Sequence, residues 1–167
     1  MTPRPTENGP ADWLGVLYDR HADALYRYAV MLLADSAAAS DAVHQVFLAI
    51  AGRPSSHIRE EERYLRRAVR NECYSVLRHR RREVVGDYLP LLEAVAANDE
   101  KLEERLAIEA AIRTLPVEQR EVLHLKVFDG WTFQEIADQL GESINTVASR
   151  YRYALEKLRG QLGTSRT

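Results

Sequence analysis

The sequence predicts an all-α protein built from two small helical domains that are joined by a flexible linker. Glycine and proline are sparse, at 8 and 6 of the 167 residues, so few positions interrupt a helix. Apolar residues recur at helical spacing in several segments that short polar breaks separate. No two alternating runs rich in Val, Ile and Thr are joined by a hairpin turn, so nothing indicates a β-sheet.

Charge is segregated along the chain although the net charge is only −2. Residues 53–82 contain ten Arg and four acidic residues, whereas residues 83–104 contain one Lys and seven acidic residues. A basic block of this size is typical of a surface that binds a polyanion such as nucleic acid.

The composition also indicates where the protein works. The single cysteine, Cys73, excludes an internal disulfide and fits a reducing, cytoplasmic environment. No run of 18 apolar residues is present, so we expect no membrane-spanning segment. Residues 1–10 are polar and carry proline, so we expect a disordered tail and not a signal peptide.

The first domain is expected to begin with a helix over residues 12–33, followed by a helix that Ser36 opens and Gly52 closes. On the second helix one arc is apolar and is expected to be buried: Val43, Val46, Phe47 and Ile50. The other side carries polar groups around one apolar side chain: Asp41, His44, Gln45 and Leu48. An exposed Leu in such a setting indicates a protein-binding patch, although a single exposed Leu is also compatible with no function.

A third helix is expected over residues 60–82, with an apolar side and a basic side. The apolar side comprises Leu65, Ala68, Val69, Cys73 and Val76. The basic side comprises Arg63, Arg67, Arg70, Asn71, Tyr74, Arg78 and Arg81. Arginines interrupted by an aromatic residue suit a surface that follows phosphates and stacks an unpaired base, and a solvated Arg face is the alternative.

Residues 83–100 are expected to form an acidic linker. Gly86 and Pro90 interrupt any helix there, and a short helical piece fits only around residues 91–97. A helix over residues 100–114 then begins the second domain. Pro116 suits the first turn of the next helix, which ends at Asp129-Gly130 and carries the apolar residues Val122, Leu123, Leu125 and Phe128.

The stretch after Gly130 predicts a helix-turn-helix. Thr132 and Glu135 have the spacing of a capping box at the start of a helix. Gly141 suits the left-handed conformation that ends this helix, and Ser143 can cap the next one. Two helices joined by such a short turn form a helix-turn-helix.

The second helix of this unit has an apolar arc and a hydrogen-bonding arc. The apolar arc comprises Val147, Tyr151, Ala154, Leu155 and Leu158. The residues expected to contact duplex DNA are Asn145, Thr146, Ser149, Arg150, Arg152, Tyr153 and Lys157. Among them Asn145 and Arg152 are placed to reach base edges, and Arg150 and Lys157 to reach phosphates. A solvated helix face that binds nothing is the alternative.

Taken in order, these segments resemble bacterial RNA polymerase sigma factors of the small extracytoplasmic-function (ECF) type, which contain only domains two and four. In the first domain the resemblance is carried by LYRYAVMLLAD, SDAVHQVFLAI and YLRRAVRNECYSVLRHRRR. In the second it is carried by LPVEQREVLHLKVFDGWTFQEIADQLGESINTVASRYRYALEKLR. It implies domain two over residues 11–82, domain four over 101–162 and a short tail over 163–167.

The resemblance also implies what each surface binds. Asp41, His44, Gln45 and Leu48 would dock on the clamp coiled coil of the largest subunit of core RNA polymerase. The basic side of the third helix would hold the downstream (minus-ten) promoter element and its melted strand. The recognition helix would read the upstream (minus-thirty-five) element, and domain four would also meet the flap region of the polymerase. An anti-sigma factor is left open as a further partner.

The chain departs from the family at Val43-His44-Gln45, where members usually have Val-Gln-Glu. This removes a carboxylate from the surface expected to dock on the polymerase. The competing interpretation is a stand-alone helix-turn-helix regulator that binds duplex DNA without core polymerase. We expect no enzyme, metal or cofactor, because no Gly-rich phosphate loop, metal-ligand cluster or nucleophile–base pair is recognisable.

Overall fold

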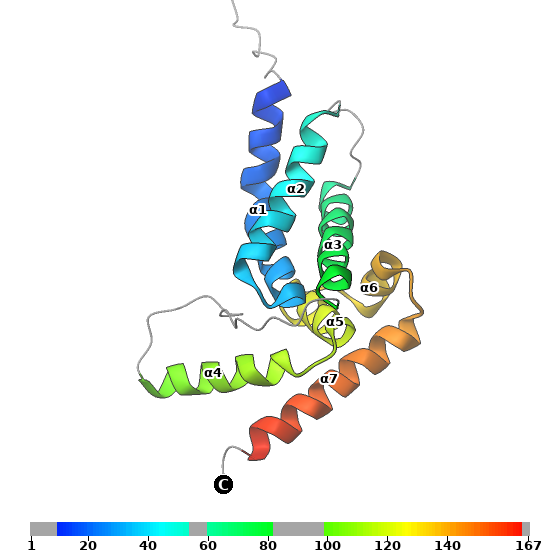
Figure 1. Cartoon of the computed structure of the whole chain (residues 1–167). Helices are drawn as coiled ribbons and strands as arrows, with labels where there is room; N and C mark the ends of the chain where they lie inside the picture. Colours follow the sequence, from blue (N-terminus) through cyan, green and yellow to red (C-terminus); the bar gives the residue numbers. More distant parts are fainter. Residues whose placement is uncertain (1–9, 54–59, 82–98, 165–167) are drawn as a thin grey trace, which may run out of the picture. The chain divides into compact units, whose positions relative to one another are not determined.

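The structure, a computed structural model, describes residues 10–53, 60–81 and 99–164, and all of its regular elements are α-helices, as predicted (Figure 1). Most of the predicted linker, residues 83–98, and most of the expected tail, residues 1–9, lie outside the described residues. The helices are α1 (Pro10–Leu33), α2 (Ser36–Ala51), α3 (Glu61–Arg80), α4 (Asp99–Arg113), α5 (Val117–Val127), α6 (Phe133–Leu140) and α7 (Ile144–Thr164).

The chain divides into two compact units. The first contains most of α1 and α2 together with α3, and the second contains α4 to α7. The helices α1 to α6 begin and end within two residues of the expected positions where these are described, and α7 begins directly after its predicted cap, Ser143.

In the first unit α1 contacts both α2 and α3. The ring of Tyr18 on α1 meets that of Phe47 on α2 edge to face, with 4.9 Å between the centroids. The predicted apolar arc of α2 is buried throughout, and on α3 Leu65 and Cys73 are fully buried. The first unit therefore has a three-helix core, and the outer sides of α2 and α3 do not take part in it.

The predicted buried side of α3 needs two corrections. Ala68 and Val76 are only half-buried, because the buried arc is rotated toward Arg66 and Cys73. Arg66 is 2% exposed, and its guanidinium lies 5.1 Å from the centroid of the Tyr28 ring on α1. It also donates to Glu62 at 3.5 Å. A charge this deeply buried needs such partners, so Arg66 joins α3 to α1 and adds nothing to the basic surface.

In the second unit α7 packs against α4, α5 and α6. The residues at its centre are fully buried: Val122, Leu125, Ile136, Val147 and Ala154. Phe128 was expected on the apolar side of α5, but it follows the end of that helix and is 54% exposed. Its ring stacks on that of the buried His124, with 5.3 Å between the centroids. The stacking covers one face of Phe128 and leaves the other in solvent.

The hydrogen bonds at the ends of α6 and α7 confirm the predicted helix-turn-helix. The Thr132 Oγ1 accepts from the Glu135 backbone N–H at 3.1 Å, and the Thr132 N–H donates back to the Glu135 carboxylate at 2.8 Å. Gly141 ends α6 with a φ of 67°, which a side chain would strain. The Ser143 Oγ accepts from the Thr146 N–H at 3.1 Å and caps α7. These local bonds fix the start of α7.

Candidate functional site

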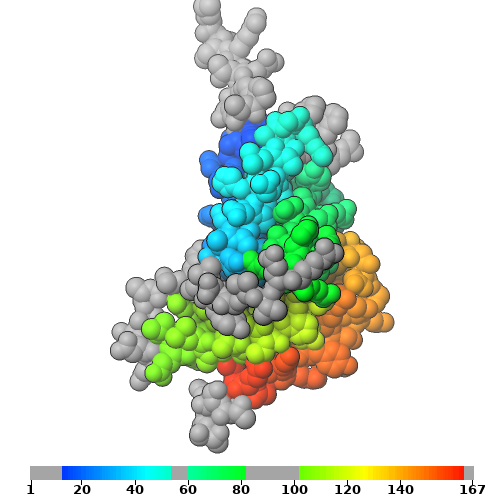
Figure 2. All heavy atoms as spheres, in the orientation of Figure 1, coloured from blue at the N-terminus to red at the C-terminus, as the bar shows by residue number. Residues whose placement is uncertain are grey.

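The outer side of α2 carries an apolar side chain surrounded by polar ones. Asp41, His44, Gln45 and Leu48 are all exposed, and Leu48 is 63% exposed. We call these four residues the α2 surface. Figure 2 shows the outer side of α2, in cyan, uncovered in this view.

A side chain of α1 lies beside one residue of the α2 surface. The Tyr18 ring, itself 39% exposed, lies edge-on to His44 with 6.4 Å between the centroids. Nothing in the sequence placed Tyr18 beside His44. An exposed Leu among polar side chains, one of which lies against an aromatic ring, resembles the centre of a protein interface.

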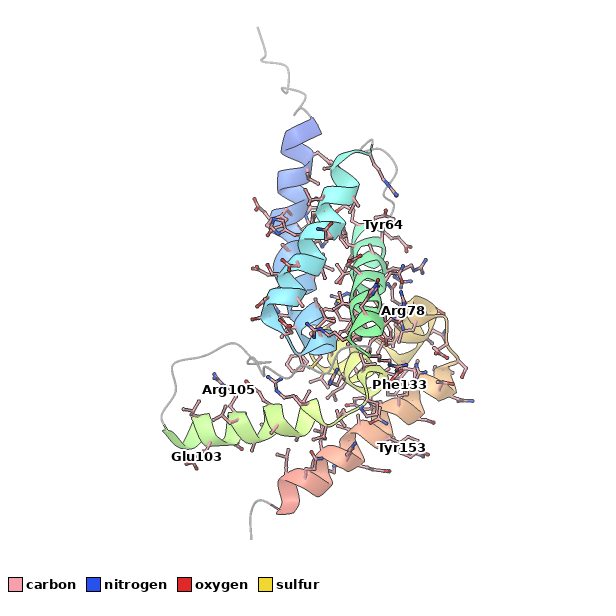
Figure 3. All side chains as sticks on the ribbon, in the orientation of Figure 1. Tyr64, Arg78, Glu103, Arg105, Phe133 and Tyr153 are labelled. Carbon is pink, nitrogen blue, oxygen red and sulfur yellow. The ribbon has the colours of Figure 1, made fainter. Side chains whose placement is uncertain are left out.

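The basic side of α3 forms a continuous arc, which we call the α3 face: Arg63, Arg67, Arg70, Asn71, Tyr74, Arg78 and Arg81. Arg67, Asn71, Arg78 and Arg81 are exposed, and the other three are half-buried. Figure 3 shows Arg78 projecting from α3. The Arg70 guanidinium lies 4.4 Å from the centroid of the Tyr74 ring, which it orients on the face.

The cations of the α3 face differ in their partners, and Arg63 lies 3.9 Å from the Glu60 carboxylate. Among the described residues, no carboxylate or hydrogen-bond acceptor engages the side chains of Arg67, Arg78 and Arg81. Two of the three acids of α3, Glu61 and Glu62, lie in its first turn, where the positive end of the helix dipole favours them. The third, Glu72, lies in the middle of the helix and lines a groove between α2 and α3. The α3 face therefore presents a positive potential that a polyanion can meet directly.

A groove of about 290 Å³ lies between α2 and α3. The Arg53 guanidinium donates to the Tyr64 Oη at 2.9 Å, and both residues line the groove with Asn71 of the α3 face and Gln45 of the α2 surface. Figure 3 labels Tyr64 at the start of α3. Sequence reasoning missed Arg53 and Tyr64 as site residues, because they lie eleven positions apart on different segments. The groove adds hydrogen-bonding groups at the edge of the α3 face.

The outer side of α7, which we call the α7 face, carries the predicted duplex contacts: Asn145, Thr146, Ser149, Arg150, Arg152, Tyr153 and Lys157. Asn145, Arg152, Tyr153 and Lys157 are exposed, and the other three are half-buried. Figure 3 shows Tyr153 on α7, where it is 51% exposed. The face combines amide, hydroxyl and guanidinium groups, which suit base edges and phosphates in a DNA groove.

Each predicted cation of the α7 face already has an acceptor. The Arg150 guanidinium lies 3.0 Å from the carboxylate of Glu142, in the turn before α7. The Arg152 guanidinium lies 3.8 Å from Glu156, and the Lys157 ammonium donates to the Thr114 carbonyl at 2.9 Å. Arg150 and Lys157, expected to point toward phosphates, thus have partners within the second unit.

Two kinds of site are absent from the described residues. No group of three His, Cys, Asp or Glu side chains is arranged to hold a metal ion across residues 10–53, 60–81 and 99–164. No helix in these ranges has the length and the apolar content needed to cross a membrane.

Two sequence families match the chain, one in each unit. Sigma-70 region 2 matches residues 17–83, and Sigma-70, region 4 matches residues 105–158. The ECF RNA polymerase sigma factor SigL of Mycobacterium tuberculosis is 34% identical over 160 residues, which cover 90% of each chain. SigM of the same organism, another ECF RNA polymerase sigma factor, is 30% identical over 153 residues, which cover 88% of this chain and 76% of SigM.

Solved structures share the fold. The sigma factor RpoE, solved in complex with the anti-sigma factor NepR from Bartonella quintana, superposes with a TM-score of 0.70 at 25% identity. The match covers 92% of this chain and 95% of that one. CnrH, solved with the cytosolic domain of CnrY, gives a TM-score of 0.64 at 23% identity, which shows the fold alone.

Proposed function

This chain belongs to the ECF family of RNA polymerase sigma factors, which direct the polymerase to promoters, and we propose that its three surfaces divide this function among them. The α2 surface binds core RNA polymerase, the α3 face holds the melted strand of the downstream element, and the α7 face reads the upstream duplex. The observation that carries the proposal is the presence of two chemically different cationic faces, one in each unit.

The α2 surface is the core-binding surface because it exposes apolar area without an evident use inside the first unit. Leu48 is its apolar centre, and Asp41 and Gln45 form a polar rim, the usual arrangement at protein interfaces. We assign its partner as the clamp coiled coil of the largest subunit. Gln45 stands where family members usually have Glu, so the rim depends less on charge.

Replacing Leu48 tests this assignment directly. Leu48→Arg should weaken assembly with core polymerase by at least about thirty-fold, because it puts a charge at the centre of the interface. Val16→Arg is the matched control, since Val16 is another exposed apolar residue of the first unit, at 47% exposure. Co-elution with core polymerase measures assembly, and circular dichroism checks folding. Normal assembly by folded Leu48→Arg would remove the α2 surface from consideration.

The α3 face suits opened DNA because it combines arginines, which can bind phosphates, with the aromatic ring of Tyr74. Tyr74 can stack on an unpaired base while Arg67 and Arg78 meet phosphates. A regulator that binds only duplex DNA needs no such face, and the match of residues 17–83 to Sigma-70 region 2 also disfavours a stand-alone regulator. Co-purification with core polymerase separates the two functions.

The α7 face suits duplex DNA because it lies on the second helix of a helix-turn-helix. Asn145 and Arg152 are exposed and can reach base edges from this helix. Sequencing of the DNA that the reconstituted holoenzyme retains should show two separated elements, of which only the upstream one responds to substitutions in α7. Retention of DNA without a common upstream element would contradict the assignment.

The remaining proposals follow from the same function. The chain performs no catalysis itself and requires no cofactor, because the polymerase carries the chemistry. It acts in the cytoplasm, where the polymerase is, and domain four also meets the flap region of the polymerase. The complex of RpoE with NepR supports an anti-sigma factor as a further partner of this chain.

A further inference from the structure

The ion pair between Glu142 and Arg150 connects the turn of the helix-turn-helix to the recognition helix. Their side chains approach to 3.0 Å and are 37% and 25% exposed. Neither side chain has another ion-pair or hydrogen-bond partner among the described residues. The pair thus stands alone at the surface, on the part of α7 that faces the proposed duplex.

The chemistry of this pair resembles that of an arginine bound to a phosphate. A guanidinium binds a carboxylate and a phosphate with the same planar set of N–H donors, so one can replace the other. An exposed ion pair shifts an equilibrium by no more than about five-fold, so exchange of partners is easy. A carboxylate left beside DNA after the exchange also repels the phosphates.

We propose that Glu142 is a positioning residue that competes with DNA phosphate for Arg150 and so lowers the affinity of the chain for its upstream element. In the free protein the carboxylate holds the guanidinium, and on the duplex Arg150 leaves Glu142 for a phosphate oxygen. Glu142 therefore limits how tightly the second unit holds any duplex. The inference rests on the proposed assignment of the α7 face to duplex DNA.

A double-mutant cycle tests the competition. The full chain and its variants Glu142→Gln, Arg150→Ala and the double variant are titrated against a fluorescein-labelled duplex, enriched from a random-sequence pool by the holoenzyme. Glu142→Gln should tighten binding about two- to five-fold, the range expected for an exposed ion pair. In the Arg150→Ala background the same change should have almost no effect beyond loss of one negative charge.

Asp138→Asn is the matched control for that loss of charge. Asp138 is exposed on α6, where it accepts from Gln134 at 2.9 Å, and among the described residues it makes no ion pair with the α7 face. The proposal is supported if Glu142→Gln tightens binding more than Asp138→Asn does and the excess vanishes with Arg150→Ala. It is overturned if the two effects are equal, if the excess persists without Arg150, or if Glu142→Gln weakens binding.

Two further variants separate a failure of this inference from a failure of the proposed function. Asn145→Ala and Arg152→Ala should weaken binding to the same duplex whatever Glu142 does. If they do so while Glu142 and Arg150 show no coupling, only the competition is wrong. If neither weakens binding, the assignment of the α7 face to duplex DNA fails as well. Circular dichroism of each variant confirms that the helices persist.

Discussion

The α3 face and the α7 face are both cationic, but a larger share of the cations on the α7 face has an acceptor within the described residues. On α3, Arg67, Arg78 and Arg81 engage no acceptor among the described residues. On α7, Arg150 lies against Glu142 and Lys157 donates to a backbone carbonyl. The first face is therefore ready to bind a polyanion, whereas the second must first release its own partners.

This difference matches the kind of DNA that each face is proposed to hold. A melted strand is flexible and offers phosphates in no fixed geometry, so exposed arginines such as Arg67 and Arg78 suit it. A duplex has a regular backbone, and discrimination between sequences comes from base edges and not from phosphates. Weaker phosphate contacts of α7 lower the affinity for every sequence alike. The base contacts of Asn145 and Arg152 then determine which sequence binds most tightly.

The largest expected effect is the loss of promoter opening when the α3 face is disrupted. Arg67→Ala/Tyr74→Ala should reduce run-off transcription from a linear promoter by about ten- to hundred-fold, because stacking of one base contributes about 1–3 kcal/mol. Activity should recover largely on a template whose downstream element is already melted. Run-off transcription on the two templates measures the difference.

Arg20→Ala serves as the control for the α3 double variant. Arg20 is an exposed arginine of the first unit, but it pairs with Glu61 at 3.1 Å and lies off the α3 face. It should transcribe both templates normally. If the double variant stays inactive on the melted template, the α3 face does not act at the opening step.

The helices and caps could be predicted because their causes are local. The capping hydrogen bonds join residues no more than four positions apart, so their spacing in the sequence is enough to predict them: those of Thr132, Glu135, Gly141 and Ser143. The apolar arc of α2 could be predicted for the same reason, since helical periodicity determines which side chains share a side. The outward direction of Leu48 follows from that arc.

The side-chain partners could not be predicted because they come from other elements. Periodicity does not show that Arg66 meets Tyr28 on α1, or that Glu142 crosses the turn to Arg150. The sequence therefore places Arg150 on the recognition helix as an expected phosphate contact, but it does not show the carboxylate of Glu142 beside it. Phe128 was placed on the wrong side because its stacking on His124 holds it at the surface.

A smaller effect is expected from Arg152, and it tests whether the α7 face reads sequence. Arg152→Ala should cost about 1–3 kcal/mol on a duplex with the upstream element, the value of a good base contact. The loss on a scrambled duplex should be smaller, since only electrostatic attraction is removed there. Fluorescence anisotropy on both duplexes measures the two losses. Equal losses would make Arg152 a phosphate contact like the arginines of α3.

The smallest expected effect concerns Lys157, which the sequence alone places among the phosphate contacts. Its ammonium donates to the Thr114 carbonyl, directly after α4, where the negative end of that helix favours a cation. Lys157→Met keeps most of the apolar stem and should lower the free energy of unfolding of the second unit by about 0.3–1 kcal/mol.

The salt dependence of DNA binding separates this role from a phosphate contact. Loss of a phosphate contact reduces the slope of log affinity against log salt by about 0.9, whereas loss of a bond inside the protein leaves the slope unchanged. We expect an unchanged slope for Lys157→Met and a reduced slope for Arg150→Ala, measured on the same duplex. A reduced slope for both would show that Lys157 leaves Thr114 when DNA binds. Arg150 and Lys157 would then both exchange an acceptor within the protein for a phosphate. This exchange would be what distinguishes the α7 face from the α3 face.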